Sequence, residues 1–260
     1  MTALGVTVLA SGSAGNALLV HNHQEGLLID SGLSLRALRQ RMRISGLSEN
    51  MVKGILITHE HIDHIRGLRV CAEYFKVPVY ASRLCAEKLR YLDPKLGAVV
   101  RFAPGGEFQL GEFKITPFPL EHDAVDPVGY VISRCSRKIG LAMDLGQAGR
   151  MTEFQLRSCD TILLESNHDL NMLAASQRPW YLKQRILGPQ GHLSNQQSSE
   201  CLARVLSPNT RNVILMHLSQ ECNTAALADA SARAELQKLQ RTDVNLMVSH
   251  QDKPLETAWA

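Results

Sequence analysis

Three histidines and one aspartate cluster early in the chain, in the pattern His59-x-His61-x-Asp63-His64. Imidazole nitrogens and carboxylate oxygens are good ligands for zinc, iron or manganese. His59 and His61 alternate along the chain, so both can converge on one ion. Asp63 and His64 lie on the next turn of the loop, where they could bind a second ion. A polar loop that caps a helix is the alternative, but a solvated loop has no need of three imidazoles. The pattern therefore predicts a metal-dependent activity.

Four short apolar segments each run into a side chain that could bind metal. These side chains are Asp30, His59, Asp144 and His217. Sheets in α/β proteins gather functional groups at the carboxyl ends of their strands, so we expect the four side chains to meet at one edge of the fold. Taken singly, Asp144 could cap a helix or turn and His217 could be a core histidine. Their position at strand ends favours a shared site.

The elements that must position these residues follow from hydrophobic periodicity and from glycine and proline breaks. Strands are predicted at residues 6–10, 17–21, 26–30, 53–58, 77–81, 99–102, 107–110, 113–118, 128–133, 138–143, 161–164, 212–216 and 244–248. Helices are predicted at 35–44, 64–76, 82–91, 152–157, 170–176, 180–187, 195–206 and 225–240. No repeat or change in composition marks a boundary, so we expect one domain over residues 1–260, with sheets covered by outer helices.

Composition narrows the class of protein. Hydrophobic residues make up 45% of the 260 residues and charged residues only 20%, which argues against disorder. A net charge of +3 is too small for binding to nucleic acid through bulk charge alone. Cys71 and Cys85, the closest pair of the six cysteines, are 14 residues apart, and scattered thiols suit a reducing cytosol. The N-terminal segment fits neither a signal peptide nor a membrane span, so we expect a soluble cytoplasmic protein with no membrane partner.

The motifs resemble a known family. The HxHxDH loop, the strand that ends in Asp30-Ser31-Gly32, and the later Asp144 and His217 resemble the metallo-β-lactamase fold hydrolases. Several longer motifs are similar to the YycJ/WalJ branch, which is related to PhnP-type phosphodiesterases and ribonuclease Z. These motifs are residues 11–16 (SGSAGN), 165–169 (ESNHD), 191–195 (GHLSN) and 217–219 (HLS). The resemblance implies an αβ/βα sandwich of two mixed β-sheets with helices on the outer faces. It also implies a 5′→3′ exonuclease acting on DNA.

By position, the resemblance implies a ligand set for two divalent metal ions, which could be zinc, manganese or iron. One ion would be held by His59, His61 and His122, the second by Asp63, His64 and His217, and Asp144 would bridge them. From the residues alone, His122 could equally be a turn histidine. Asp30 is expected to orient a ligand imidazole through a hydrogen bond. Two ions about 3.5–4 Å apart can deprotonate a shared water, and this hydroxide would attack phosphorus.

Asp63, His192 and His168 are the candidate catalytic residues. His192 would protonate the leaving oxygen, a role that the corresponding histidine of ribonuclease Z-like relatives supports; the alternative is an ordinary loop histidine. It precedes Ser194, which forms a capping-box pattern with Gln197 at the start of the helix predicted at 195–206. The N-terminus of that helix would attract a phosphate, with Ser194 as a contact.

Other candidate phosphate contacts have equally good structural explanations. His168 could contact the phosphate or the leaving group, or it could lie in a loop that Asp169 caps. Ser11, Ser13 and Asn16 lie in a turn of small residues whose amides could approach a phosphate closely, or which simply joins two strands.

Metal-dependent hydrolysis follows from the residues, whereas DNA as the substrate follows from the family resemblance. A stripe formed by Arg36, Arg39 and Arg43 could contact DNA, but a solvated helix face explains it at least as well. Aromatic residues are 5% of the chain, so no stacking platform for single strands is evident. The alternatives are a hydrolase of a cyclic phosphodiester, thioester or lactone, a redox di-iron protein, and a binding protein that has kept the fold.

Overall fold

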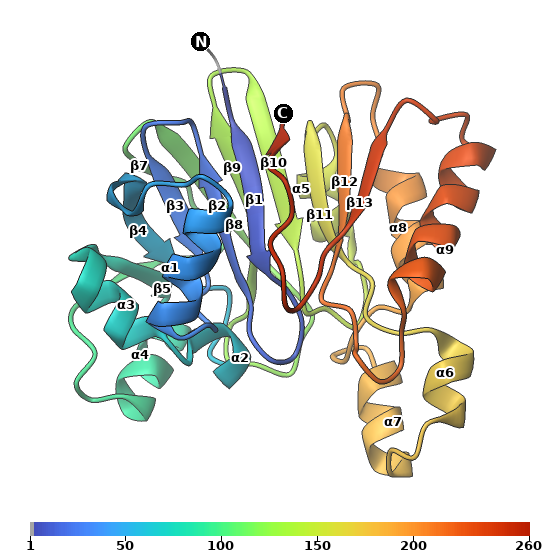
Figure 1. The fold of residues 1–260 in the computed structure, drawn as a ribbon. Helices are drawn as coiled ribbons and strands as arrows, with labels where there is room; N and C mark the ends of the chain where they lie inside the picture. The colour runs from blue at the N-terminus through green and yellow to red at the C-terminus, as the bar shows by residue number, and fades with distance from the viewer. Residues whose placement is uncertain (1–2) are drawn as a thin grey trace.

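Two mixed β-sheets of seven strands each form the centre of the molecule (Figure 1). The structure is a computed structural model, and it describes residues 3–260. The first sheet has the strand order β14 (Ala258–Trp259), β1 (Gly5–Ala10), β2 (Ala17–His21), β3 (Gly26–Ile29), β4 (Val52–Leu56), β5 (Val79–Ser82) and β6 (Val99–Phe102). Its strands β3 to β6 run parallel, whereas β1, β2 and β3 pair antiparallel.

The second sheet repeats this plan. Its order is β13 (Asn245–Val248), β12 (Asn212–Met216), β11 (Thr161–Glu165), β10 (Arg137–Ala142), β9 (Val128–Arg134), β8 (Phe113–Pro119) and β7 (Phe108–Leu110). Strands β10 to β13 are parallel, and β7 to β10 pair antiparallel. In each sheet the parallel strands therefore end at a common edge.

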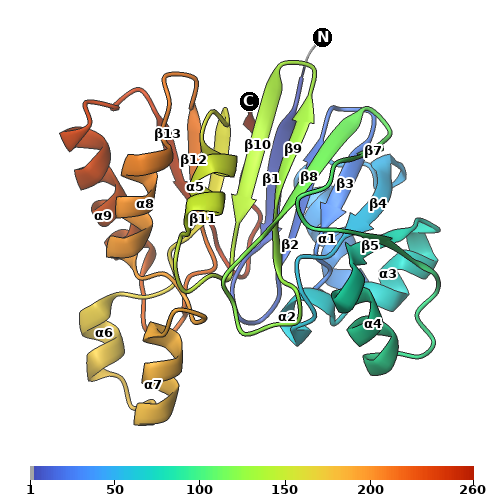
Figure 2. The ribbon, with the colours of Figure 1, turned by 180° about the vertical axis from the view of Figure 1, so that it is seen from behind.

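Helices cover the outer face of each sheet, as Figures 1 and 2 show from opposite sides. The first sheet carries α1 (Leu35–Ile44), α3 (Leu68–Phe75) and α4 (Arg83–Leu92), with the short α2 (Ile62–Ile65) and a 3₁₀ turn at Glu49–Met51. The second carries α5 (Arg150–Leu156), α8 (Asn195–Val205) and α9 (Ala225–Lys238), while α6 (Leu170–Ala175) and α7 (Trp180–Leu187) project beyond it. The predicted αβ/βα sandwich is confirmed.

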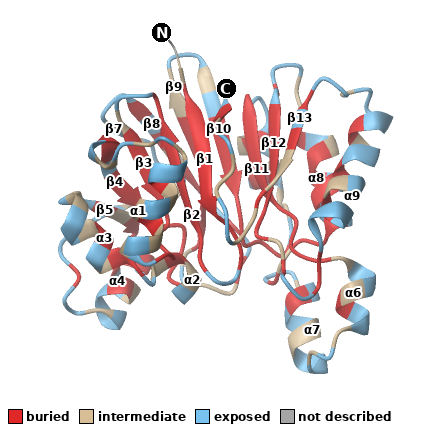
Figure 3. Cartoon of the chain, in the orientation of Figure 1, coloured by how far each residue is buried: buried red, intermediate tan, exposed pale blue. Residues whose placement is uncertain are grey.

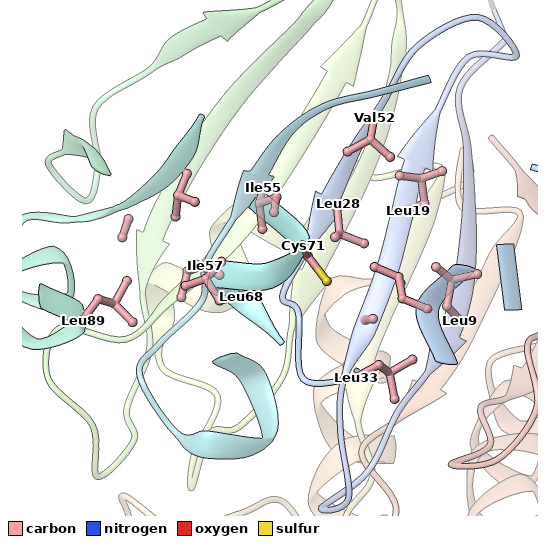
Figure 4. Packing of buried hydrophobic residues seen from close by; sticks show 14 of the residues in the cluster. Leu9, Leu19, Leu28, Leu33, Val52, Ile55, Ile57, Leu68, Cys71 and Leu89 are labelled. Carbon is pink, nitrogen blue, oxygen red and sulfur yellow. The ribbon is translucent and has the colours of Figure 1, made fainter. Parts of the chain in front are cut away.

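Three apolar layers hold the sandwich together. Figure 3 shows that the central strands are mostly buried. Strand β3 illustrates how one strand serves two layers: Leu27 and Ile29 pack between the sheets, and Leu28 packs against the helices of the first sheet. Figure 4 shows this helix-facing layer, in which Cys71 of α3 and Leu89 of α4 meet the sheet. Because both faces of the central strands are buried, they are apolar runs rather than alternating ones.

The predicted elements correspond closely to the structure, with a few differences. The helix predicted at 64–76 is two helices, α2 and α3, because the chain turns at Gly67. A Cβ at Gly67 would lie 1.9 Å from the carbonyl oxygen of Leu33, so only glycine fits where this turn packs against the neighbouring loop. The strand predicted at 53–58 is shorter and ends at Leu56, and β14 and the 3₁₀ turn were not predicted because each is very short.

Gly32 marks the closest approach between the loop after β3 and the HxHxDH loop. A Cβ there would lie 1.7 Å from the Asp63 carbonyl oxygen and 2.6 Å from the Asn16 nitrogen, both backbone atoms that are hydrogen-bonded to each other. We expect Gly32→Ala to lower the free energy of unfolding by about 3 kcal/mol, the upper end for overpacking, since neither loop can retreat. Chemical denaturation measures this loss. Gly97→Ala is the matched control, because a Cβ at Gly97 meets nothing within 4 Å. An equally stable Gly32→Ala variant would contradict the packing argument.

Within residues 3–260, no helix is long and apolar enough to cross a membrane. In that same range all six cysteines are free thiols. Arg39 of the predicted basic stripe is bound by Glu49, with 2.9 Å between Nε and Oε1, as expected for a solvated helix face.

Candidate metal centre

The loops that follow the parallel strands of both sheets meet at the lower edge of the molecule in Figure 1, beside α2. Asp30 follows β3, His59 follows β4, Asp144 follows β10 and His217 follows β12. The four side chains predicted at strand ends therefore lie at one edge of the structure, as expected. Asp30, Asp144 and His217 also share left-handed backbone angles, with φ of 58°, 59° and 55°. Such angles cost about 1–3 kcal/mol each and are typical of functional sites.

The first group of possible metal ligands is His59, His61 and His122, whose ligand atoms all lie within 4.8 Å of one another. His122 Nε2 is 3.3 Å from His61 Nδ1. The other nitrogen of His122 lies 3.1 Å from the carbonyl oxygens of Gln190 and Gly191. These backbone oxygens fix Nδ1 as the donor, so Nε2 is left as a ligand atom.

The second group is Asp63, His64 and His217. Asp63 Oδ2 is 3.5 Å from Nε2 of His64 and 3.5 Å from Nε2 of His217. The opposite nitrogen of His64, Nδ1, donates to Asp30 Oδ2 at 2.8 Å. Asp30 also accepts from the backbone nitrogen and the hydroxyl of Thr58, so its carboxylate is held firmly while it orients the imidazole.

Asp144 lies between the two groups. Its Oδ2 is 3.1 Å from His64 Nε2, and its Oδ1 is 3.0 Å from His217 Nδ1. It also forms a possible ligand group with His59 and His64. One buried carboxylate is thus within reach of ions in both groups.

Several atoms of the site are buried without a hydrogen-bond partner among the described residues. They include His59 Nε2 and His217 Nε2. An unpartnered buried polar atom costs about 1–3 kcal/mol, so two of them in one place need an explanation. Bound cations would satisfy nitrogen and oxygen atoms together. The donor set therefore fits two divalent metal ions, and their identity is open because imidazole and carboxylate suit zinc, manganese and iron alike.

Residues 26–218 match the family described as a β-lactamase superfamily domain. The chain belongs to the β-lactamase superfamily. Among its relatives, exodeoxyribonuclease YycJ of Bacillus anthracis is 35% identical over 237 residues, which cover 90% of each chain. Exodeoxyribonuclease WalJ of Streptococcus pneumoniae is 34% identical over 85% of this chain and 84% of its own.

Solved structures show the same similarity at the level of the fold. The metallo-β-lactamase fold protein YhfI of Bacillus subtilis superposes with a TM-score of 0.73 at 15% identity, over 97% of this chain and 99% of its own. The predicted family is confirmed: the chain is a hydrolase of the metallo-β-lactamase fold. The ligand groups described above are therefore the candidate metal site of a superfamily member, and their side chains could bind two divalent ions.

Burial and carboxylates set the pKa values of the site histidines. Burial lowers the pKa of His59 well below its usual 6.5, and the nearby His64 lowers it further. Burial alone would also lower the pKa of His64 and His217. Asp30 and Asp144 together outweigh burial at His64, and Asp144, Asp63 and Glu165 together outweigh it at His217, so the pKa of each ring is raised well above 6.5. The raised pKa values favour the protonated form of both rings when no metal is bound.

Metal binding is expected to release protons, because ligation needs neutral imidazoles and the pKa values of His64 and His217 are raised. Apparent affinity should rise with pH as long as the pH is below the raised pKa values, and then level off. The same protons stabilise the metal-free fold below about pH 6.5, and this contribution is lost as the pH passes the folded-state pKa. Calorimetry of Zn²⁺ or Mn²⁺ binding in buffers with different ionisation enthalpies counts the protons. Binding at neutral pH without proton release would contradict the prediction.

Glu165 also belongs to the site, although no role was predicted for it from the sequence. It is fully buried at the end of β11, and its Oε1 lies 2.9 Å from His217 Nδ1 and 2.8 Å from His192 Nδ1. Its Oε2 accepts from the backbone nitrogens of Leu145 and Leu193. These histidines bring the pKa of the carboxyl down to about 2, against the effect of burial. Its position at a strand end is a signal that could have identified it, because β11 ends in Glu165 between β10 and β12, which run into Asp144 and His217.

His192 lies beside the site with part of its side chain exposed. Its Nδ1 contacts Glu165 and is 3.5 Å from Asp144 Oδ1. Burial lowers its pKa, but the charge of Glu165, the hydrogen bond to Glu165 and the charge of Asp144 together outweigh burial, so the pKa is raised. A raised pKa and a partly exposed ring fit the predicted proton donor.

The four predicted phosphate contacts differ in what they can reach. Ser13 is exposed and lines a cavity beside His192 and His217. Ser11 is buried, and its hydroxyl accepts from the backbone nitrogen of His217 at 2.8 Å. Buried Asn16 has its Nδ2 3.3 Å from Asp63 Oδ2 and 3.0 Å from His64 Nε2. The structure thus uses Ser11 and Asn16 to hold loops and ligands in position.

Ser194 and His168 are both buried. Ser194 is the N-cap of α8 and forms the predicted capping box with Gln197, which is confirmed. His168 has no exposed surface, and neither ring nitrogen has a hydrogen-bond partner among the described residues. Burial lowers its pKa to about 4. Its neighbour Asp169 caps α6, accepting from Met172 N at 2.9 Å. In this conformation the neutral His168 ring cannot touch a substrate, and its catalytic role stays a prediction.

Proposed function

We propose that the protein is a dinuclear metal-dependent phosphodiesterase that acts on DNA as a 5′→3′ exonuclease. The observation that carries this proposal is that two ligand groups lie side by side and that Asp144 forms a further possible ligand group with one histidine of each, His59 and His64. We assign His59, His61 and His122 to one ion and Asp63, His64 and His217 to the other, with Asp144 as the bridge. Residues 1–260 are proposed to act as one domain.

Two divalent ions held in this way would lower the pKa of a water and offset the negative charge of a phosphate. The protein's own residues supply the rest. His64 and His217 are oriented by Asp30 and Glu165, so their Nε2 atoms point into the site. His192, with its raised pKa, gives a proton to the leaving oxygen. Glu165 stabilises the charged ring of His192 before that transfer.

DNA as the substrate is supported by two relatives that are named exodeoxyribonucleases and align over most of their length. The 5′→3′ polarity rests on the resemblance of the sequence motifs alone. With a net charge of only +3, the protein must bind DNA through local contacts near the site. A DNA substrate also agrees with the cytoplasmic location that the sequence predicts.

The test is hydrolysis of DNA labelled at the 5′ or the 3′ end by the metal-loaded protein, beside hydrolysis of bis(p-nitrophenyl) phosphate. Mononucleotides released first from the 5′ end would support the proposal. Activity on the small ester alone would contradict the exonuclease proposal and indicate a phosphodiesterase of small molecules. Inactivity on both substrates, in a protein shown to contain two ions, would refute phosphodiester hydrolysis.

A further inference from the structure

Helices α6 and α7 form an arm, residues 170–187, which projects beyond the second sheet (Figures 1 and 2). The arm contains Arg178, Lys183 and Arg185 and no aspartate or glutamate. A segment with this charge favours an anionic partner. The arm follows the loop that holds Asn167 and His168, so it begins next to the candidate metal centre.

Two aromatic side chains lie exposed at the start of α7. Trp180 is 68% exposed and Tyr181 is 72% exposed. The small core of the arm is made by Leu173, Ile186 and Cys222 with Leu182, so the two aromatic rings are not needed to hold its helices together. Two consecutive exposed aromatic side chains that the packing does not use are a candidate contact surface for a partner.

The arm also forms one wall of a cavity of about 200 Å³ at the metal centre. Arg178 and Arg185 line this cavity together with His192 and His217. Tyr181 precedes Arg185 by four residues, so the two side chains lie on the same flank of α7. His192, Arg185 and Tyr181 therefore lie one after another, from the candidate proton donor to an exposed aromatic ring.

Both cavity arginines can still bind a phosphate. Arg178 Nε is 2.8 Å from Glu221 Oε2, and Arg185 Nε contacts Asp123. A guanidinium has five N–H donors, so these contacts hold the side chains in place and leave donors for an anion. Arginines beside exposed aromatic rings are the combination by which proteins bind single-stranded nucleic acid without sequence preference.

We propose that the arm is a binding platform for single-stranded DNA, on which bases next to the cleaved nucleotide stack on Tyr181 and Trp180. Arg178 and Arg185 would contact the intervening phosphates. This inference rests on the proposed function, because it takes the substrate to be a DNA strand. A second protein surface could also cover two aromatic rings, but the cations and the link to the cavity favour the nucleic acid.

Binding can be tested apart from catalysis. The full chain in EDTA is titrated into a fluorescein-labelled oligo(dT) of about 20 nucleotides, and anisotropy gives the Kd. Trp180→Ala with Tyr181→Ala is expected to weaken binding by about 5-fold to 100-fold, the loss that one or two base stacks produce. Trp180→Phe with Tyr181→Phe keeps two rings and should restore most of the affinity. Tyr91→Ala is the matched control, because Tyr91 is 78% exposed but lies on α4, on the other sheet.

The outcomes separate this proposal from the proposed function. Unchanged Kd in the double alanine variant, with an unchanged melting temperature, would overturn the platform. Unchanged Kd together with conversion of a dimer to a monomer would instead assign the two rings to contact between copies of the chain. Loss of affinity in both the alanine and the phenylalanine variants would overturn stacking as the cause. If the metal-loaded wild type cleaves no phosphodiester, the proposed function fails, while the Kd values still decide the platform.

Discussion

Asp144→Asn is expected to lower kcat/KM for phosphodiester hydrolysis by about 10³-fold or more and to loosen both metal ions. The reason is position: Asp144 is the buried carboxylate between the two ligand groups, 3.1 Å from His64 Nε2 and 3.0 Å from His217 Nδ1. An asparagine keeps the size of the side chain but removes its negative charge. Metal analysis by mass spectrometry and steady-state kinetics on bis(p-nitrophenyl) phosphate measure the two effects.

A variant that alters only one ligand group tests whether the effect of Asp144→Asn comes from its position between the two groups. Asp63→Ala alters one ligand group only, so the protein should keep one ion tightly and lose the other, whereas Asp144→Asn should weaken both. Asp252→Asn, at an exposed carboxylate away from the ligand groups, is the matched control and should change neither quantity. Two tightly bound ions and full activity in both Asp63→Ala and Asp144→Asn would rule out the two-ion assignment.

Glu165→Gln is expected to lower metal affinity by about 10-fold to 100-fold, although Glu165 is in neither proposed ligand set. The carboxylate accepts on both sides, from His192 and His217 through Oε1 and from the Leu145 and Leu193 backbone nitrogens through Oε2. An amide has one oxygen, so its NH₂ group must face donors on one side. Leaving those buried donors unpaired should also lower the free energy of unfolding by about 1–3 kcal/mol.

A change in pH dependence distinguishes an orienting role of Glu165 from a merely structural one. The charge of Glu165 contributes to the raised pKa of His192, so without that charge the alkaline limb of the profile, where His192 loses its proton, should shift to lower pH. The pH profile of kcat for the small ester shows this shift. Glu73→Gln, the same substitution at an exposed position, should leave profile, affinity and stability as in the wild type. A normal pH profile and metal affinity in Glu165→Gln would show that the carboxylate does not act through these rings.

The sequence was sufficient for the fold because the signals involved are local. Buried central strands are apolar on both faces, as in β3 and β11, and such runs separated by glycine and proline breaks are visible without a structure. Short elements such as β14 gave no signal, and the break between α2 and α3 was missed. That break depends on the contact of Gly67 with Leu33, which lies far away in the sequence.

The residues also determined the chemistry by themselves: the HxHxDH spacing and the strand-end carboxylates predict metal-dependent hydrolysis before any distance is known. Tertiary structure decided what each side chain does. It brought Glu165 into contact with two site histidines, placed Ser11 and Asn16 in hydrogen bonds with His217 and His64, and buried His168. It also brought Trp180 and Tyr181 to the exposed surface of the arm, although aromatic residues are scarce. The physical reason is that ligand type is a property of one residue, whereas orientation and access depend on neighbours that only folding brings together.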